Sequence, residues 1–400
     1  MQKTQVRLFS ALIAGAALLA ACGSSSTSGS GATSAPTTAK GTDTTVASTT
    51  GGGGGVKCSG IKLAFIGALS GDNGNLGKNM VNGAKIAIDA FNAKNPDCQV
   101  GFDTSYDSQG DPAQATPLAD KIVNDASIIG LIGPGFSGES KATMPKFEAA
   151  NLPMITPGAT NAKLSTNGWK MFHRILANDD KQAPGVVTLI QNTIKATKVG
   201  VIDDASDYGK GLADAVRKGL GAADVANAQI DPKAADFSAA VQAMKAANVD
   251  TIFYGGYYAE AAKLVKQVRD AGLTAKFVSG DGSLDKGFVD NGGAATDGAY
   301  LTATGAPADV NADFQAAFNK AYGTDPALYS PEAYDCASVF LAGIAAGKVT
   351  RKDLADFVSA YDAPGITKQI KFDATGEPVG SAVYYSVVEG GKIVAKGLIK

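Results

Sequence analysis

From residue 60 onward the chain alternates short apolar runs with longer amphipathic stretches, and this alternation restricts its fold more than any other feature. Within the amphipathic stretches, apolar residues recur at helical spacing, as in Leu76, Met80, Ala84, Ile88 and Phe91. The runs have the length and β-branched content of buried strands and occupy residues 61–69, 127–132, 152–156, 198–203, 250–254, 276–279 and 298–302. Strands that alternate with helices build parallel sheets covered by helices. The pattern therefore predicts an α/β fold.

The length of the chain predicts two such units. Its 400 residues exceed what one hydrophobic core usually organises. A strand-like run at 171–175 is followed by Asn178, which can cap the next helix, so we expect a boundary between 178 and 179. A second crossing is expected near residues 305–307 (Gly-Ala-Pro). The last two runs, 382–388 and 392–398, meet at a Gly-Gly pair and predict a hairpin.

The first residues have the character of an export signal. Lys3 and Arg7 precede an apolar segment at 8–19 that is too short to span a bilayer. The segment ends in Leu-Ala-Ala-Cys-Gly, which resembles the bacterial lipobox, so we expect a lipoprotein signal peptide at 1–21 and acylation of Cys22. The alternative is an ordinary signal peptide that contains a cysteine. Acylation would anchor the exported protein to the outer face of the cell membrane.

Residues 22–56 are low in complexity and rich in Ser, Thr, Gly, Ala and Pro. Such a segment has little apolar surface to bury, so we expect a disordered tether.

Two of the remaining cysteines precede neighbouring strand-like runs. Cys58 comes just before residues 61–66, and Cys98 just before 99–103. If these strands are parallel neighbours, a disulfide is feasible in an exported protein; two free thiols are the alternative. Cys336 lies in a helical stretch and is expected to be buried. The cysteine and histidine spacing predicts no metal site.

Charge and motifs argue against several functions. Lys and Arg number 36 against 38 Asp and Glu, which is not the basic surface that nucleic acid requires. His173 is the only histidine, and the sequence around Ser137 lacks the last glycine of a nucleophile elbow. We therefore expect neither an enzyme nor a cofactor.

Four predicted strand ends carry distinctive polar residues, and ligands of open α/β sheets bind at such ends. Ser137 and Thr160 follow two strands and could hold a carboxylate. Tyr257 follows a Gly-Gly turn, and Asp281 lies between glycines, where its carboxylate suits an ammonium group. The alternatives are a helix cap for Ser137, an aromatic core position for Tyr257 and plain turns for the other two. Together the four offer what a zwitterion needs, because burying unpaired charge is costly.

At these residues the chain resembles the branched-chain amino acid (Leu/Ile/Val) binding proteins of ABC transporters, which are type I periplasmic binding proteins. The likeness runs from about residue 57 to the end of the sequence. It is carried by the segments 67–71, 82–84, 107–112, 157–161 (Pro-Gly-Ala-Thr-Asn), 208–211 and 254–258 (Tyr-Gly-Gly-Tyr-Tyr).

The resemblance implies two doubly wound parallel-sheet lobes joined by a three-stranded hinge. Residues 57–178 with 306–380 would form lobe 1, and 179–305 with 381–400 would form lobe 2. The implied ligand-binding set is Leu76, Ser137, Gly158, Ala159, Thr160, Tyr208, Tyr257, Asp281 and Tyr329.

The resemblance also implies a role for most of these residues. Ser137 and Thr160 would bind the ligand carboxylate. The Gly158 carbonyl, the Thr160 hydroxyl and Asp281 would hold the ammonium group. From the second lobe, Tyr208 and Tyr257 would close over the ligand. A family tyrosine that lines the side-chain pocket is similar to Tyr329.

Two positions depart from the family. Leu76 stands where the family often has an aromatic residue, and Asp281 stands where its best-known members have glutamate. Both changes reshape the pocket, so the resemblance favours an amino acid more strongly than leucine in particular. The implied function is capture of a small amino acid, branched-chain or otherwise aliphatic, by a monomer and delivery to ABC permease subunits. The alternatives are an amide, urea or small carboxylate ligand, or a sensor for a signalling partner.

Overall fold

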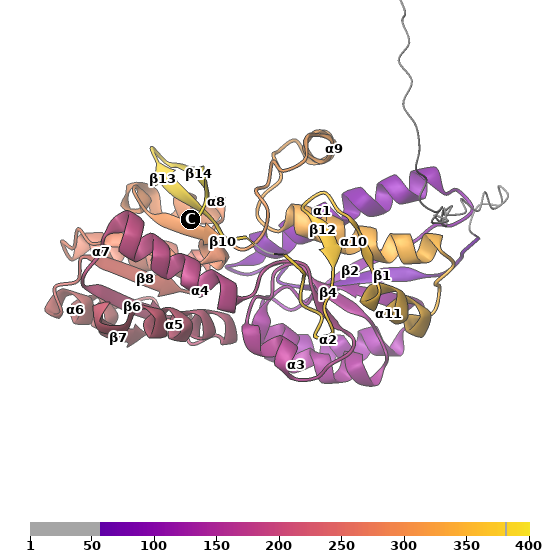
Figure 1. Ribbon diagram of the computed structural model, residues 1–400, viewed down its shortest axis with the longest axis horizontal. Coiled ribbons are helices and arrows are strands. Elements are labelled where there is room, and N and C mark those ends of the chain that lie inside the picture. Colours follow the sequence, from indigo (N-terminus) through magenta and orange to yellow (C-terminus); the bar gives the residue numbers. More distant parts are fainter. Residues whose placement is uncertain (1–56, 381) are drawn as a thin grey trace, which may run out of the picture. The chain divides into compact units, whose positions relative to one another are not determined.

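The computed structural model describes residues 57–380 and 382–400 (Figure 1). The predicted signal peptide, the acylated Cys22 and the tether lie outside these residues. Within the described part, no helix is both long and apolar enough to cross a membrane.

The first sheet is entirely parallel, with the strand order β2-β1-β3-β4-β5. Helices α1 and α10 pack together on one side of it, and α2 and α3 on the other (Figure 1). The elements of this half are β1 (Lys62–Gly67), α1 (Gly74–Lys94), β2 (Gly101–Asp107), α2 (Pro112–Asn124), β3 (Ile128–Ile132), α3 (Ser137–Ala149), β4 (Met154–Thr156), η1 (Ala162–Thr166), β5 (Phe172–Arg174), α9 (Ala312–Tyr322), α10 (Ser330–Ala345), α11 (Arg351–Ser359), β11 (Asp362–Pro364) and β12 (Gln369–Lys371).

The second sheet has the order β14-β13-β10-β9-β8-β6-β7, and its pairings are parallel except for β10 with β13 and β13 with β14, which are antiparallel. Its elements are α4 (Asp179–Thr188), η2 (Leu189–Ile194), β6 (Val199–Asp203), α5 (Asp207–Leu220), η3 (Gly221–Ala223), β7 (Asp224–Gln229), α6 (Ser238–Ala246), β8 (Thr251–Gly255), α7 (Tyr258–Asp270), β9 (Lys276–Ser279), η4 (Asp281–Ser283), α8 (Lys286–Gly292), η5 (Gly293–Thr296), β10 (Tyr300–Ala303), β13 (Tyr384–Glu389) and β14 (Lys392–Leu398).

Local chemistry explains where individual helices begin. Asp111 caps α2 by accepting a hydrogen bond from the Ala113 amide, and Pro112 takes the first helical position, where no N–H is needed. Ser206 caps α5 in the same way through the Gly209 amide (2.8 Å). As expected, Asn178 caps α4.

The predicted strands are confirmed to within two or three residues at most ends, and the C-terminal hairpin is confirmed as β13 and β14. The prediction was wrong at β2, which begins at Gly101 and continues to Asp107 beyond the expected end at residue 103. The strand β7 was not predicted; it is an edge strand of the second sheet whose side chains alternate between partly buried and exposed. Neither strand is a continuous apolar run, because only one face of each is covered.

Three segments connect the two sheets: one after β5, one after β10 and one before β13. The first two run close together, since the Ala177 amide donates to the Thr304 carbonyl (3.3 Å). The predicted α/β class with two parallel-sheet lobes is thus confirmed, while the lobe boundaries at 178, 305 and 380 stay a prediction.

The strands β1 and β2 are parallel neighbours, and a disulfide joins Cys58 to Cys98 just before them. Cys336 is a free cysteine buried in α10.

Candidate ligand-binding site

The residues singled out at the strand ends lie at the carboxyl edges of the two sheets. Thr160 follows β4, Tyr257 follows β8 and Asp281 follows β9. Ser137 is the first residue of α3, whose N-cap is Phe136, so the alternative interpretation of Ser137 as a helix cap is wrong. Its hydroxyl accepts a hydrogen bond from the Asn161 amide (3.1 Å), which links the start of α3 to the loop that carries Thr160.

Asp281 is the centre of the hydrogen-bond network. Its carboxylate accepts hydrogen bonds from the hydroxyls of Tyr208 (2.7 Å) and Tyr329 (2.6 Å) and from the Gln182 amide (2.9 Å). Asp281 is fully buried, and burial raises its pKa, while these three donors act in the opposite direction. Two predicted site residues, Tyr208 and Tyr329, are therefore bound directly to a third.

Aromatic contacts connect this network to α3. The ring of Tyr257 lies 5.1 Å from the Tyr208 ring and 4.5 Å from the Phe136 ring, measured between centroids. Tyr257 therefore packs against an aromatic from each half of the molecule, at the position next to Ser137.

Gly158 has no side chain, and this allows neighbouring groups to lie close to its backbone. A Cβ atom there would lie 2.8 Å from the Gly135 carbonyl oxygen and 3.4 Å from the Tyr329 ring, and it would also collide with Met80. Gly158 thus borders Tyr329 and, through it, Asp281. Leu76 lies one helical turn before Met80 on α1 and is fully buried.

Thr160 has a buried hydroxyl without a hydrogen-bond partner among the described residues. Its carbonyl accepts a hydrogen bond from the Asp179 amide (2.9 Å) at the first turn of α4. Buried polar groups are nearly always paired in proteins, so this hydroxyl is available to bind a ligand.

Asp179 was not predicted as a site residue. Its side chain is 3% exposed, and neither carboxylate oxygen has a partner in the part of the chain described. Burial raises the pKa of Asp179 well above its ordinary value, and the charge of Asp281 raises it further, while the adjacent Thr160 hydroxyl and the charge of Arg174 oppose the rise. An acidic residue directly after a predicted lobe crossing was the available signal.

A buried arginine supports the loop at 158–161. The Arg174 guanidinium donates through Nη1 to the carbonyls of Ala159 (2.8 Å) and Asn161 (3.0 Å). The other side of the guanidinium is paired with the Glu377 carboxylate. The Ala159 amide donates to the Thr156 hydroxyl (2.9 Å), so this predicted residue is held from both sides.

Contacts between the two halves border the site on both flanks. On one flank, Lys141 of α3 forms an ion pair with Asp207 of α5 (2.7 Å), and the side-chain amide of Asn161 donates to the Asp207 carbonyl. On the other flank, Asn75 and Asn79 of α1 donate to Asp285 (3.1 and 3.3 Å). The two halves are therefore closed over the site.

This arrangement can bind a molecule that carries both charges. The first turn of α3 and the hydroxyls of Ser137 and Thr160 offer donors for a carboxylate. Asp179 and Asp281 offer carboxylates for a cationic group. The described residues contain no group of three or more acidic, histidine or cysteine side chains that could hold a metal ion.

Two α/β halves that meet around a buried, charge-lined site define a two-lobed solute-binding protein. Comparison with known proteins gives the family: the chain belongs to the periplasmic binding proteins, whose family model matches residues 60–392. The resemblance seen in the sequence is thus confirmed.

Individual relatives agree with this assignment. The chain is 34% identical to the leucine-specific-binding protein of Salmonella typhimurium over 254 residues, which is 62% of this chain and 68% of that protein. It is 32% identical to the Leu/Ile/Val-binding protein of Escherichia coli K12 over 249 residues, 60% of this chain and 67% of that protein.

A solved structure shares the fold as a whole. The branched-chain amino acid transporter substrate-binding protein LivJ of Streptococcus pneumoniae, determined with isoleucine, superimposes with a TM-score of 0.78 at 27% identity. The likeness covers 85% of this chain and 99% of that one.

Proposed function

We propose that this protein captures a small aliphatic amino acid, of the branched-chain class, between its two lobes and delivers it to an ABC importer. The observation that carries the proposal is the buried Thr160 hydroxyl near the buried carboxylates of Asp179 and Asp281, neither of which forms an ion pair among the described residues. The names of the relatives support the same ligand class.

In the proposed complex, the ligand carboxylate accepts hydrogen bonds from Ser137 and Thr160. The ligand ammonium binds Asp281 and the Gly158 carbonyl, with Asp179 as a second carboxylate nearby. Without the ligand, the charge on Asp281 is stabilised only by hydrogen bonds from hydroxyl and amide groups. An ammonium group supplies the positive charge that a buried carboxylate requires.

The side chain of the ligand would face Tyr329 and Leu76. Leucine at position 76 leaves more room than an aromatic residue, so we propose a pocket that accepts leucine, isoleucine and valine.

Binding proceeds by hinge closure. Ser137 and Thr160 belong to proposed lobe 1 (57–178 and 306–380), and Tyr208, Tyr257 and Asp281 to lobe 2 (179–305 and 381–400). The ligand touches both sets only when the lobes are closed, so its binding energy favours the closed state. The protein acts as a monomer and catalyses no reaction.

We further propose that the protein is exported and held at the outer membrane face by lipid on Cys22. Replacement of Cys22 by Ser should move the protein from the membrane fraction to the soluble fraction. Continued acylation of the variant would contradict the assignment.

Calorimetric titration of the full chain with L-leucine, L-isoleucine and L-valine tests the function. We expect saturable binding that weakens at least a hundredfold in Asp281→Ala, while Asp290→Ala, an exposed residue of α8, serves as the matched control. Equal affinity of Asp281→Ala and the unaltered chain would overturn the site.

The same titration separates the ligand classes. A small carboxylate or neutral amide would leave the carboxylates of Asp179 and Asp281 without a cationic partner, and burial of such charge is costly. We therefore expect 4-methylpentanoate, which is leucine without its amino group, to bind at least a hundredfold more weakly than leucine.

A further inference from the structure

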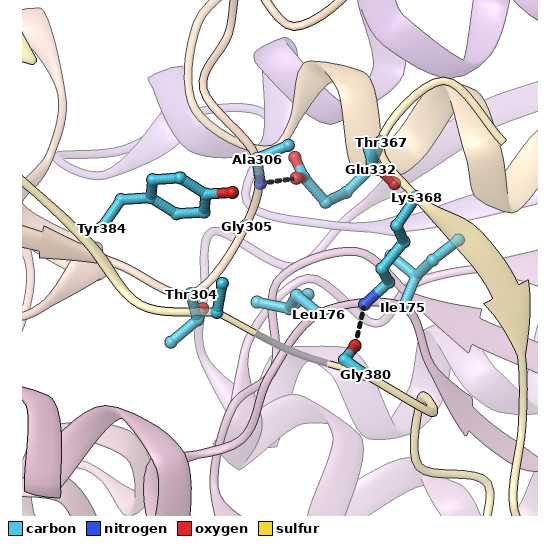
Figure 2. Close-up of a pocket in the computed structure, with 11 residues that line it drawn as sticks. Ile175, Leu176, Thr304, Gly305, Ala306, Glu332, Thr367, Lys368, Gly380 and Tyr384 are labelled. Carbon is cyan, nitrogen blue, oxygen red and sulfur yellow. Dashed lines mark hydrogen bonds between the residues drawn. The ribbon is translucent and has the colours of Figure 1, made fainter. Parts of the chain in front are cut away.

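A cavity lies where the chain passes between the two sheets (Figure 2). Ile175, Thr304 and Ala382 line it from the three connecting segments, together with Glu332 of α10 and Lys368 of the loop between β11 and β12. Its volume is about 230 Å³, several times the roughly 30 Å³ that one water molecule occupies in the liquid. The cavity shares no lining residue with the network around Asp281.

Two buried oxygen atoms at this cavity lack partners. Glu332 is 1% exposed; one carboxylate oxygen accepts from the Ala306 amide (2.7 Å), and the other has no hydrogen-bond partner among the described residues. The Thr304 hydroxyl, which is also buried, is unpartnered within the same part of the chain. Each such group destabilises the folded protein when it stays unpaired. The two oxygen atoms therefore favour a ligand that donates hydrogen bonds.

Lys368 contributes a positive charge to the wall of the same cavity. Its ammonium points toward the Gly380 carbonyl rather than toward Glu332 (Figure 2), and this contact is long, at 3.4 Å. An ammonium group has three hydrogen atoms to donate, so it can still bind an anionic oxygen. The two opposite charges face one cavity without neutralising each other directly.

The pKa shifts of Glu332 and Lys368 agree with the absence of a direct ion pair between these two side chains. Burial raises the pKa of Glu332 to about 7; its own backbone amide, the Ala306 amide and the charge of Lys368 oppose the rise, and the charge of Asp335 adds to it. Burial lowers the pKa of Lys368, and the nearby charges of Glu332 and Asp335 only partly offset this. A guest that brings a cation to Glu332 and an anion to Lys368 would stabilise both charged forms.

We propose that this hinge cavity is a second binding site, for a small zwitterion of the amino acid class. The guest ammonium binds the free oxygen of Glu332 and the Thr304 hydroxyl, and the guest carboxylate binds the Lys368 ammonium. The site is separate from the one around Asp281, and the proposal does not depend on what that site binds.

Glycine is the probe, because it carries both charges in the smallest form. Crystals of the full chain soaked in glycine should show it between Glu332 and Lys368. Equilibrium dialysis of labelled glycine against Asp281→Ala, in which the first site is disabled, should give one bound molecule per chain. Lys368→Met in that background should weaken binding at least tenfold, and the nearly isosteric Thr304→Val severalfold.

Lys371→Met, in the neighbouring strand β12, is the matched control and should bind glycine as before. Water alone in the cavity of soaked crystals, or equal binding by the Lys368→Met and Lys371→Met proteins, would overturn the proposal. The affinity of Asp281→Ala for leucine is measured separately, so a failure of the first site is distinguished from a failure of this one.

Discussion

Arg174 and Glu377 form a buried ion pair although 203 positions separate them in the sequence. The arginine side chain is fully buried, and it also holds the carbonyls of Ala159 and Asn161. The last segment of the first half therefore fixes the loop that presents Thr160.

Removal of the carboxylate should destabilise the protein and weaken ligand binding together. Glu377→Gln leaves the Arg174 guanidinium buried without its counter-charge, and breaking a buried pair costs about 3–5 kcal/mol. Because the Glu377 side chain is 14% exposed, we expect the lower end of that range. Urea unfolding and leucine titration measure the two effects.

The control is Asp356→Asn, which breaks an exposed ion pair with Lys352 on α11. Such pairs contribute at most about 1 kcal/mol. Similar losses of stability in the two variants would contradict a special role for the buried pair.

The ion pair between Arg174 and Glu377 shows which parts of the structure could be predicted from the sequence and which could not. The central strands were predictable because both of their faces are buried, which makes them continuous apolar runs, as in β3 and β8. Ser137, Thr160, Tyr257 and Asp281 could be grouped because strand ends of a parallel sheet share one edge. No local pattern links Arg174 to Glu377, since their pairing depends on the tertiary path of the chain.

Asp179 was missed for a different reason. An aspartate at the start of a helix is common, because it interacts favourably with the helix dipole. Only the structure reveals that its carboxylate is buried near Asp281 instead of solvated.

The disulfide should contribute substantially to stability. Cys58 and Cys98 are 40 positions apart, and closing a loop of this size stabilises a folded chain by roughly 3–4 kcal/mol in the loop-entropy account. The Cys58→Ser/Cys98→Ser protein should unfold at lower urea concentration, and a reductant should lower the stability of the unaltered chain only. Mass mapping that found both thiols alkylated without reduction would contradict the bridge.

The ion pair between Lys141 and Asp207 should have a small effect on closure. Both side chains are well exposed, at 64% and 37%, so the pair contributes at most about 1 kcal/mol. Lys141→Met should therefore speed leucine dissociation no more than about fivefold, and less at high salt. Lys210→Met is the control, because its partner Asp214 lies on the same helix. A larger effect for Lys210→Met would refute the contact as a closing element.

The contact between α1 and Asp285 on the opposite flank of the site should affect the leucine dissociation rate more strongly. Asp285 is 5% exposed and accepts hydrogen bonds from the amides of both Asn75 and Asn79. The Asn75→Ala/Asn79→Ala protein leaves this carboxylate without its donors from α1, which costs about 1–3 kcal/mol. We expect leucine to dissociate about five- to a hundredfold faster, as stopped-flow fluorescence would measure. An unchanged dissociation rate would show that this flank does not hold the lobes closed.

Buried carboxyl groups should make stability depend on pH. Glu139 is fully buried at the start of α3, where its carboxyl accepts hydrogen bonds from the Phe136 amide (2.8 Å) and from Ser108. Burial raises its pKa from 4.5 to about 7, the Ser108 and Phe136 bonds oppose the rise, and the charges of Asp107 and Asp111 add to it. Between these two pH values the folded protein therefore binds more protons than the unfolded chain.

The contribution of Glu139 to stability consequently falls as the pH rises from about 4.5 to about 7, by up to about 1.4 kcal/mol per pH unit. His173 acts in the opposite direction. Burial lowers the pKa of His173 from 6.5 to about 4, so between these two pH values the folded protein binds fewer protons at this residue than the unfolded chain does. Urea unfolding at about pH 5, 6 and 7 should give a free energy that declines less steeply in Glu139→Gln than in the unaltered chain. The exposed Glu389→Gln variant should keep the original slope, and identical slopes in all three proteins would show that Glu139 stays ionised when folded.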